Sequence, residues 1–179
     1  MTEVAEHPVA LEEMLEHREA RARARGRLLE RYRQPVVTFT LVTPGPLKDT
    51  PAARLVYEEG RRALCFLLGG PDCEVLATVD EYRPTGPEGF RVVRVDPLRL
   101  KHRLAALEDT HELGRLWDLD VTDAGGHPVS RASVGMPPRR CLVCDGPAHA
   151  CARSARHPLE VVQRAIGERI DAYRLRPEP

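Results

Sequence analysis

The sequence predicts an α+β fold: one domain in which helices flank a mixed or antiparallel sheet. The chain has 179 residues, of which 42% are hydrophobic and 30% charged, as expected of a globular protein that buries a substantial core. Helical and β-rich patterns both occur, and two predicted strands (73–82 and 90–95) follow each other without a helix between them. Because neither repeats nor low-complexity linkers interrupt the chain, we expect residues 1–179 to form a single domain.

The N-terminal half is predicted to form a helix, a strand and a second helix. An apolar stripe at helical spacing indicates a helix over residues 9–33. The β-branched run at 36–41 predicts a strand, which the Pro/Gly-rich loop at 43–48 ends. Thr50 is a predicted N-cap, and the helix behind it ends at Gly69-Gly70.

Turn residues divide the rest of the chain. A Thr-Gly-Pro-Glu-Gly turn at 85–89 joins the strands at 73–82 and 90–95, and Asp96-Pro97 opens a helix that reaches about Glu108. The remaining predicted elements are a strand over 113–121, a turn at 123–126 with a return over 128–132, a Cys/Arg-rich segment over 139–157 and a C-terminal helix over 158–173.

Charge and hydropathy limit where the protein acts. There are 27 basic and 27 acidic residues, so no general attraction to nucleic acid or membranes is expected. No apolar run reaches the roughly 18 residues of a membrane helix. The acidic N-terminus lacks the apolar region of a signal peptide. We therefore expect a cytoplasmic location, in which the five cysteines stay reduced.

The strand around Trp117 carries two carboxylates. Side chains alternate along a strand, so Asp118 and Asp120 point to one face, with Cα atoms about 6.6–7 Å apart, while Trp117 points to the other. A hard divalent cation would relieve their repulsion, and Mg²⁺ held by two carboxylates suits phosphoryl or nucleotidyl transfer. The alternative is a solvated edge strand. Arg115 is near in sequence, although strict alternation places it on the Trp117 face.

Cysteines cluster after Arg140. Cys141, Cys144 and Cys151, with His157, form a set that suits tetrahedral zinc, and His149 competes as the fourth ligand. The alternative is a loop of reduced, packed cysteines.

Arginines surround this cluster and also form a stripe on the first helix. Arg139, Arg140, Arg153 and Arg156 flank the cysteines, and guanidinium groups bind phosphate oxygens in pairs, so a triphosphate or pyrophosphate fits them. Arg18, Arg21 and Arg25 share one helix face, which is either solvated or turned toward phosphate.

Several of these motifs together resemble the holo-citrate lyase synthase family, also called apo-citrate lyase phosphoribosyl-dephospho-CoA transferases. The resemblance spans roughly residues 9–170. The motifs that carry it are Leu11–Leu15, Arg18–Arg21, Pro44–Lys48, Thr85–Glu88, Thr110–Val121, Val129–Arg131, Arg140–Cys144, Cys151–Ser154 and His157.

The resemblance implies a nucleotidyltransferase. The donor would be 2′-(5″-triphosphoribosyl)-3′-dephospho-CoA, the acceptor a serine of the acyl-carrier (gamma) subunit of apo-citrate lyase, and the leaving group pyrophosphate. In this reading Asp118 and Asp120 hold Mg²⁺, Lys48 neutralises phosphate, and arginines clamp the pyrophosphate. The arginines are Arg115, Arg139, Arg140 and Arg153. Two alternatives remain: a nucleotidyltransferase that modifies another carrier protein or a small molecule, and a non-catalytic, zinc-dependent interaction module.

Overall fold

The computed structural model describes residues 7–176, whose centre is a five-stranded sheet in the order β2-β3-β1-β4-β5. All four strand pairings are antiparallel, which confirms the predicted fold class and decides between its mixed and antiparallel forms. The strands are β1 (Val36–Leu41), β2 (Glu74–Arg83), β3 (Gly86–Arg94), β4 (Trp117–Thr122) and β5 (Pro128–Val129), and the helices are α1 (Leu11–Tyr32), α2 (Pro51–Leu68), α3 (Pro97–Thr110), α4 (Ala148–Arg153) and α5 (Leu159–Arg174).

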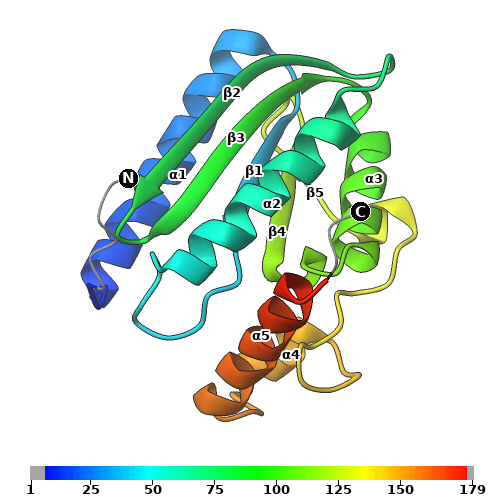
Figure 1. Ribbon diagram of the computed structural model, residues 1–179. Coiled ribbons are helices and arrows are strands. Elements are labelled where there is room, and N and C mark those ends of the chain that lie inside the picture. The colour runs from blue at the N-terminus through cyan, green and yellow to red at the C-terminus, as the bar shows by residue number, and fades with distance from the viewer. Residues whose placement is uncertain (1–6, 177–179) are drawn as a thin grey trace.

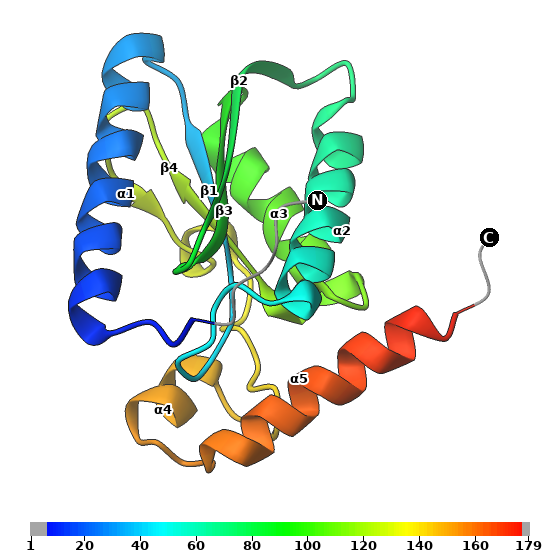
Figure 2. The same cartoon turned by 60° about the vertical axis from the view of Figure 1, so that its left-hand side comes forward.

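Helices cover both faces of the sheet. Figure 2 shows α1 on one side and α2 and α3 on the other. The larger core lies on the α2/α3 side, where the Phe39 ring stacks on Tyr57 at 4.5 Å and meets Trp117 edge-on at 6.5 Å. The smaller core lies under α1 and contains Val36, Phe90 and Val92. The larger core thus holds one face of β1 and β4, and their other face lies toward α1.

Two predicted boundaries were wrong. Residues 85–89 do not form the turn between the second and third strands, because β3 already begins at Gly86 and a two-residue turn at Pro84-Thr85 closes the hairpin. Nor does β4 begin at residue 113, because Gly114–Leu116 form a turn of 3-10 helix before the strand. At Gly114 an added Cβ would lie 2.6 Å from the Glu108 carbonyl oxygen, so this turn packs directly on the end of α3.

The caps and the C-terminal region follow the predictions more closely. The Thr50 hydroxyl accepts a hydrogen bond from the amide of Ala53 at 3.1 Å, as expected of an N-cap. The predicted return strand is present but is only two residues long. Figure 1 shows α4 and α5 beyond the end of the sheet, where Cys151 and Ile170 are the only buried side chains among residues 139–176.

None of the helices within residues 7–176 combines the length and hydropathy needed to cross a membrane.

Candidate functional site

Asp118 and Asp120 share one face of β4, as predicted. In the pairing of β1 with β4, Thr40 lies opposite Asp118 and Thr38 opposite Asp120, while Trp117 points into the core on the other side. Both carboxylates are open to solvent, with 47% and 68% of their side chains exposed. A carboxylate pair of this kind is accessible to a cation and a phosphorylated substrate.

The peptide backbone between the two aspartates is fixed by α3. The buried Glu108 carboxylate accepts a hydrogen bond from the Leu119 amide at 2.8 Å. The buried Lys101 ammonium donates to the Leu119 carbonyl oxygen at 2.8 Å. These two contacts hold both sides of residue 119, so α3 determines where the neighbouring carboxylates of Asp118 and Asp120 lie.

Each carboxylate has one distant cationic neighbour. Arg139 Nη1 is 3.7 Å from Asp118 Oδ1, and Lys101 Nζ is 3.9 Å from Asp120 Oδ1. The pKa of Asp120 is raised above its ordinary value, first by partial desolvation of its carboxylate and then by the charge of Asp118, against the opposing effect of Lys101. The pair therefore retains the repulsion that a bound divalent cation would relieve, and both groups keep oxygen lone pairs for it.

A buried carboxylate lies on the same face of the sheet, two strands away. Glu88 precedes Phe90, the residue that pairs with Thr38, by two positions on β3 and therefore points toward α1. It is 3% exposed and contacts His17 Nε2 at 3.0 Å and Arg21 Nη1 at 2.9 Å. This ion-paired cluster joins α1 to the β2–β3 hairpin at the end of the sheet that carries Asp118.

A small cavity connects this cluster with Lys48. Its volume is about 120 Å³, and Thr40, Lys48, Arg21 and Glu88 are among its lining residues. Thr40 is also the residue that pairs with Asp118, so the cavity begins one strand away from the acidic pair. Burial lowers the pKa of Lys48, whose ammonium donates to the Thr43 carbonyl oxygen. Lys48 thus lines the same cavity as Thr40, the residue that pairs with Asp118.

The other arginines divide between two positions. Arg115, Arg139 and Arg140 line a larger cavity, about 430 Å³ in volume, whose remaining walls are mostly apolar and come from α4, α5 and the loop after β1. Arg153 is exposed on α4 and does not line the cavity that contains Arg115, Arg139 and Arg140. The structure therefore brings three of the four predicted pyrophosphate-binding arginines together and leaves Arg153 outside.

Arg115 and Arg139 differ in what they bind. Arg139 contacts Glu108 at 2.9 Å and also donates to the Trp117 carbonyl oxygen, so its guanidinium links α3 to β4. Arg115 Nε and Nη2 are buried and find no hydrogen-bond partner among the described residues. Burial, and then the charge of Arg139, lower the pKa of Arg115. Its guanidinium is thus available for an anion in this cavity.

The predicted Cys/His ligand set converges in space. The ligand atoms of Cys141, Cys144, Cys151 and His157 all lie within 4.8 Å of one another. His149, the competing ligand, is exposed and does not belong to this cluster. All five cysteines of the chain are free thiols.

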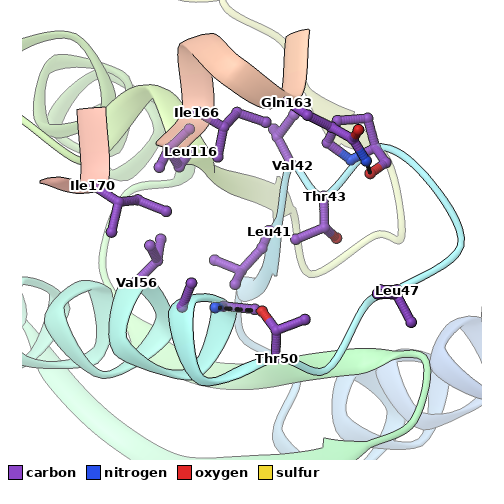
Figure 3. Close-up of a pocket in the computed structure, with 13 residues that line it drawn as sticks. Leu41, Val42, Thr43, Leu47, Thr50, Val56, Leu116, Gln163, Ile166 and Ile170 are labelled. Atoms are coloured by element: carbon purple, nitrogen blue, oxygen red, sulfur yellow. Dashed lines mark hydrogen bonds between the residues drawn. The ribbon is translucent and has the colours of Figure 1, made fainter. Parts of the chain in front are cut away.

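A third cavity lies between α2, α5 and the loop after β1, where Figure 3 shows Leu41, Val56 and Ile166 pointing inward. It is about 130 Å³ and largely apolar. Gln163 on α5 donates to the Pro44 carbonyl oxygen at 3.4 Å, so this cavity closes where α5 meets the loop that leads to Lys48.

Sequence reasoning missed the residues that support the site. Glu108 receives Arg131 Nη2 at 2.7 Å in addition to Arg139 and the Leu119 amide, and Lys101 is equally buried. Both residues lie on the predicted helix before the acidic strand, where a charged residue at a core-facing position was the available signal. Glu88 lies in the segment 85–89, for which the turn residues predict a turn and which in the structure belongs mostly to β3.

The chain is similar over nearly its whole length to proteins that carry one family description. A sequence profile of apo-citrate lyase phosphoribosyl-dephospho-CoA transferases matches residues 9–173. A protein of Vibrio cholerae serotype O1 (strain M66-2), called a probable apo-citrate lyase phosphoribosyl-dephospho-CoA transferase, is 37% identical over 174 residues, covering 95% of this chain and 98% of its own. An Escherichia coli O6:K15:H31 protein with that name, without "probable", is 37% identical over 153 residues, covering 86% and 84%.

Proposed function

We propose that this chain, which belongs to the apo-citrate lyase phosphoribosyl-dephospho-CoA transferase family, attaches a phosphoribosyl-dephospho-CoA group to apo-citrate lyase. The donor is 2′-(5″-triphosphoribosyl)-3′-dephospho-CoA and the acceptor a serine hydroxyl of the acyl-carrier (gamma) subunit. The observation that carries the proposal is the solvent-open Asp118/Asp120 pair, which has Arg139, a lining residue of the larger cavity, 3.7 Å from Asp118 and is one strand away from the smaller cavity that Thr40 and Lys48 line.

The acidic pair fits Mg²⁺. Two carboxylates on adjacent same-face positions with free lone pairs match the usual protein contribution to a magnesium site, in which phosphate oxygens complete the shell. When bound there, Mg²⁺ would neutralise charge on the triphosphate and polarise the reacting phosphorus. Glu108 and Lys101 act as positioning residues, because they hold the backbone between the two ligands.

The reaction is an in-line displacement at the phosphorus attached to the ribose. The serine oxygen forms a new P–O bond, the bond to the pyrophosphate oxygen breaks, and the serine proton is lost. One of the two aspartates accepts that proton directly or through water. The product is a phosphodiester between the serine and the prosthetic group, and pyrophosphate leaves.

Cations on both sides of the pair hold the donor. Arg115, with its unpaired guanidinium, and Arg140 bind the departing pyrophosphate in the larger cavity. Arg139 sits between that cavity and Asp118. Lys48 neutralises a phosphate oxygen from the opposite side. Arg153 acts only if the substrate extends beyond the cavity to the exposed face of α4.

The proposal places the enzyme in the cytoplasm, where its free thiols stay reduced. Of the two alternatives, a zinc-dependent interaction module has no use for an exposed pair of aspartates held in place by buried ion pairs. A transferase for another carrier protein would use the same residues, so it must be separated by experiment.

The test is a carrier-modification assay. Purified apo acyl-carrier subunit is incubated with enzyme and donor, and the mass gain on its serine is followed with and without Mg²⁺. We expect Asp118→Asn and Asp120→Asn each to lower the transfer rate by about 10²–10³-fold or more, because each removes part of the transition-state charge stabilisation. The unfolding midpoint should stay close to that of the wild type.

Asp72→Asn is the matched control, since Asp72 is an exposed carboxylate paired with Arg99 away from this face. It should retain wild-type rates. Full activity of both site variants would refute the assignment of the acidic pair, and modification of an unrelated carrier protein at an equal rate would favour the alternative transferase.

A further inference from the structure

The segment from Arg139 to Arg174 lacks a hydrophobic core of its own. Among its residues only Cys151 and Ile170 are buried, although it contains two helices and a reversing loop. Figure 2 shows α4 and α5 beyond the sheet, and the larger core reaches this region only through Ile170 and three partly buried side chains, Leu142, Ile166 and Tyr173. A small unit with so little buried apolar surface needs another source of stability, such as a metal ion.

We propose that Cys141, Cys144, Cys151 and His157 bind one zinc ion in a closed, tetrahedral, structural site. Their ligand atoms lie within 4.8 Å of one another, and the sulfurs of Cys144 and Cys151 are 3.6 Å apart. Tetrahedral zinc with Zn–S bonds of about 2.3 Å separates its sulfurs by about 3.8 Å. The cluster therefore needs only small adjustments to close around the ion.

The surroundings of the cluster are those of a zinc site. The imidazole Nε2 of His157 is buried and has no hydrogen-bond partner within residues 7–176, which a bond to a metal explains. The Val143 amide donates to Cys141 Sγ at 3.4 Å, a contact that stabilises a thiolate ligand. The Cys141 amide donates to the Gly146 carbonyl oxygen at 2.7 Å and closes the loop that carries Cys141 and Cys144.

The backbone is shaped to bring the histidine back to the cysteines. Cys151 lies on α4, and the chain reverses just after that helix. Ala155 takes the left-handed conformation (φ +45°), and the Arg156 amide donates to the Cys151 carbonyl oxygen at 3.0 Å. A non-glycine residue rarely adopts this conformation. Here it turns the chain so that His157 faces the cysteines, as a shared metal ion requires.

A zinc ion at this site would also fix one wall of the cavity proposed to bind the donor. Cys141, Cys151 and His157 are also lining residues of the cavity that contains Arg115. Four protein ligands leave no open position for water or substrate, so the zinc is structural and acts by fixing this wall. This role is separate from the transfer chemistry, and its first tests do not involve turnover.

The experiment measures metal content and thiol access in the full chain. Protein purified under reducing conditions should hold one zinc per chain, and two thiols, Cys65 and Cys73, should react with a thiol reagent. A strong chelator should expose the other three and lower the unfolding midpoint. Replacement of zinc by cobalt should give the absorption bands of a tetrahedral thiolate site.

Two histidines supply a matched pair of variants. His157→Ala should weaken zinc binding at least tenfold, while His149→Ala, whose side chain is exposed outside the cluster, should bind like the wild type. If His157→Ala does not fold, the thiol and cobalt measurements on the wild type still decide. No stoichiometric zinc after reconstitution, equal effects of the two histidine variants, or a Cys144–Cys151 disulfide in place of the metal would each overturn the proposal.

Discussion

Single residues in this protein differ in function mainly through what they are paired with. Arg139 and Arg115 line the same cavity, yet Arg139 is bonded to Glu108, while two nitrogens of Arg115 are buried without a partner. Buried donors without hydrogen-bond partners reduce stability, and such groups cluster at sites where a ligand uses them. Arg115 is therefore the arginine on which we expect the donor to depend most.

Replacing Arg115 with Met tests that view. The change removes the charge but keeps an apolar side chain of similar length, so stability should hold or rise. The value of kcat/KM for the donor should fall by about 10- to 150-fold, equivalent to the about 1.5–3 kcal/mol of hydrogen bonds to a charged group. Steady-state kinetics and urea unfolding measure the two effects.

The control for this variant is Arg153→Met, because Arg153 is exposed on α4. It should leave kcat/KM close to the wild-type value. If Arg153→Met impairs transfer as much as Arg115→Met does, the pyrophosphate lies outside the cavity.

The acidic pair and the Cys/His set could be predicted from single residues and their spacing in the sequence. Strand alternation alone puts Asp118 and Asp120 on one face, and the spacing of Cys141 and Cys144 alone suggests a shared metal. The sequence does not distinguish Arg153 from the other arginines, because the position of α4 in the folded chain decides which arginines line the cavity.

Between elements, the contact of α3 with β4 matters most for the site. One carboxylate, Glu108, receives the Leu119 amide, Arg131 and Arg139, and it is almost fully buried. A buried charge with several partners costs much when it is removed, because the cations left behind are then uncompensated. The geometry of the acidic strand thus depends on a helix.

Glu108→Ala should therefore destabilise the protein by about 3–5 kcal/mol. The neighbouring Asp109→Ala removes an ion pair of Arg131 too, but Asp109 is one-third exposed, so a loss within about 1 kcal/mol is expected. Urea unfolding followed by circular dichroism gives both values. Equal losses in the two variants would contradict the positioning role of Glu108.

Two helix glycines should respond in opposite ways to alanine. At Gly60 on α2 an added Cβ would contact the Phe39 ring and lie 2.9 Å from Trp117 Nε1, whereas at Gly26 on α1 nothing lies within 4 Å. We expect Gly60→Ala to cost about 1–3 kcal/mol through overpacking. Gly26→Ala should gain about 0.4–1 kcal/mol by reducing the entropy of the unfolded chain. Thermal unfolding of both variants checks the signs, and a stabilising Gly60→Ala would show that α2 can move away from β1.

The whole molecule consists of a well-buried sheet between helices and a C-terminal segment at its end. Helix α5 is attached mainly through partly buried side chains and surface hydrogen bonds. Tyr173 donates to Glu59 at 2.9 Å, Arg169 donates to the Glu112 carbonyl oxygen at 2.9 Å, and Ile170 is its one buried residue. Regions with little buried surface open at lower free energy than the core.

Native-state hydrogen exchange should show this difference. Amides of α5 are expected to exchange at least tenfold faster than those of β1 and β3, whose side chains are mostly buried in the two cores. Exchange measured by mass spectrometry on peptides from each region tests it. Equal protection of α5 and β1 would mean that the two regions unfold as one unit.

Local sequence patterns predict the α+β class, the positions of α1, α2, α3 and α5, and the residues of the acidic pair and the Cys/His cluster. These follow from local periodicity, caps and ligand spacing, which act over a few residues. The strand order, the two-residue turn that places Glu88 in β3, and the buried network of Glu108 and Lys101 emerge only in the folded chain. The same is true of which arginines share a cavity. All of these depend on contacts between segments far apart in the chain, whose pairing no local pattern specifies.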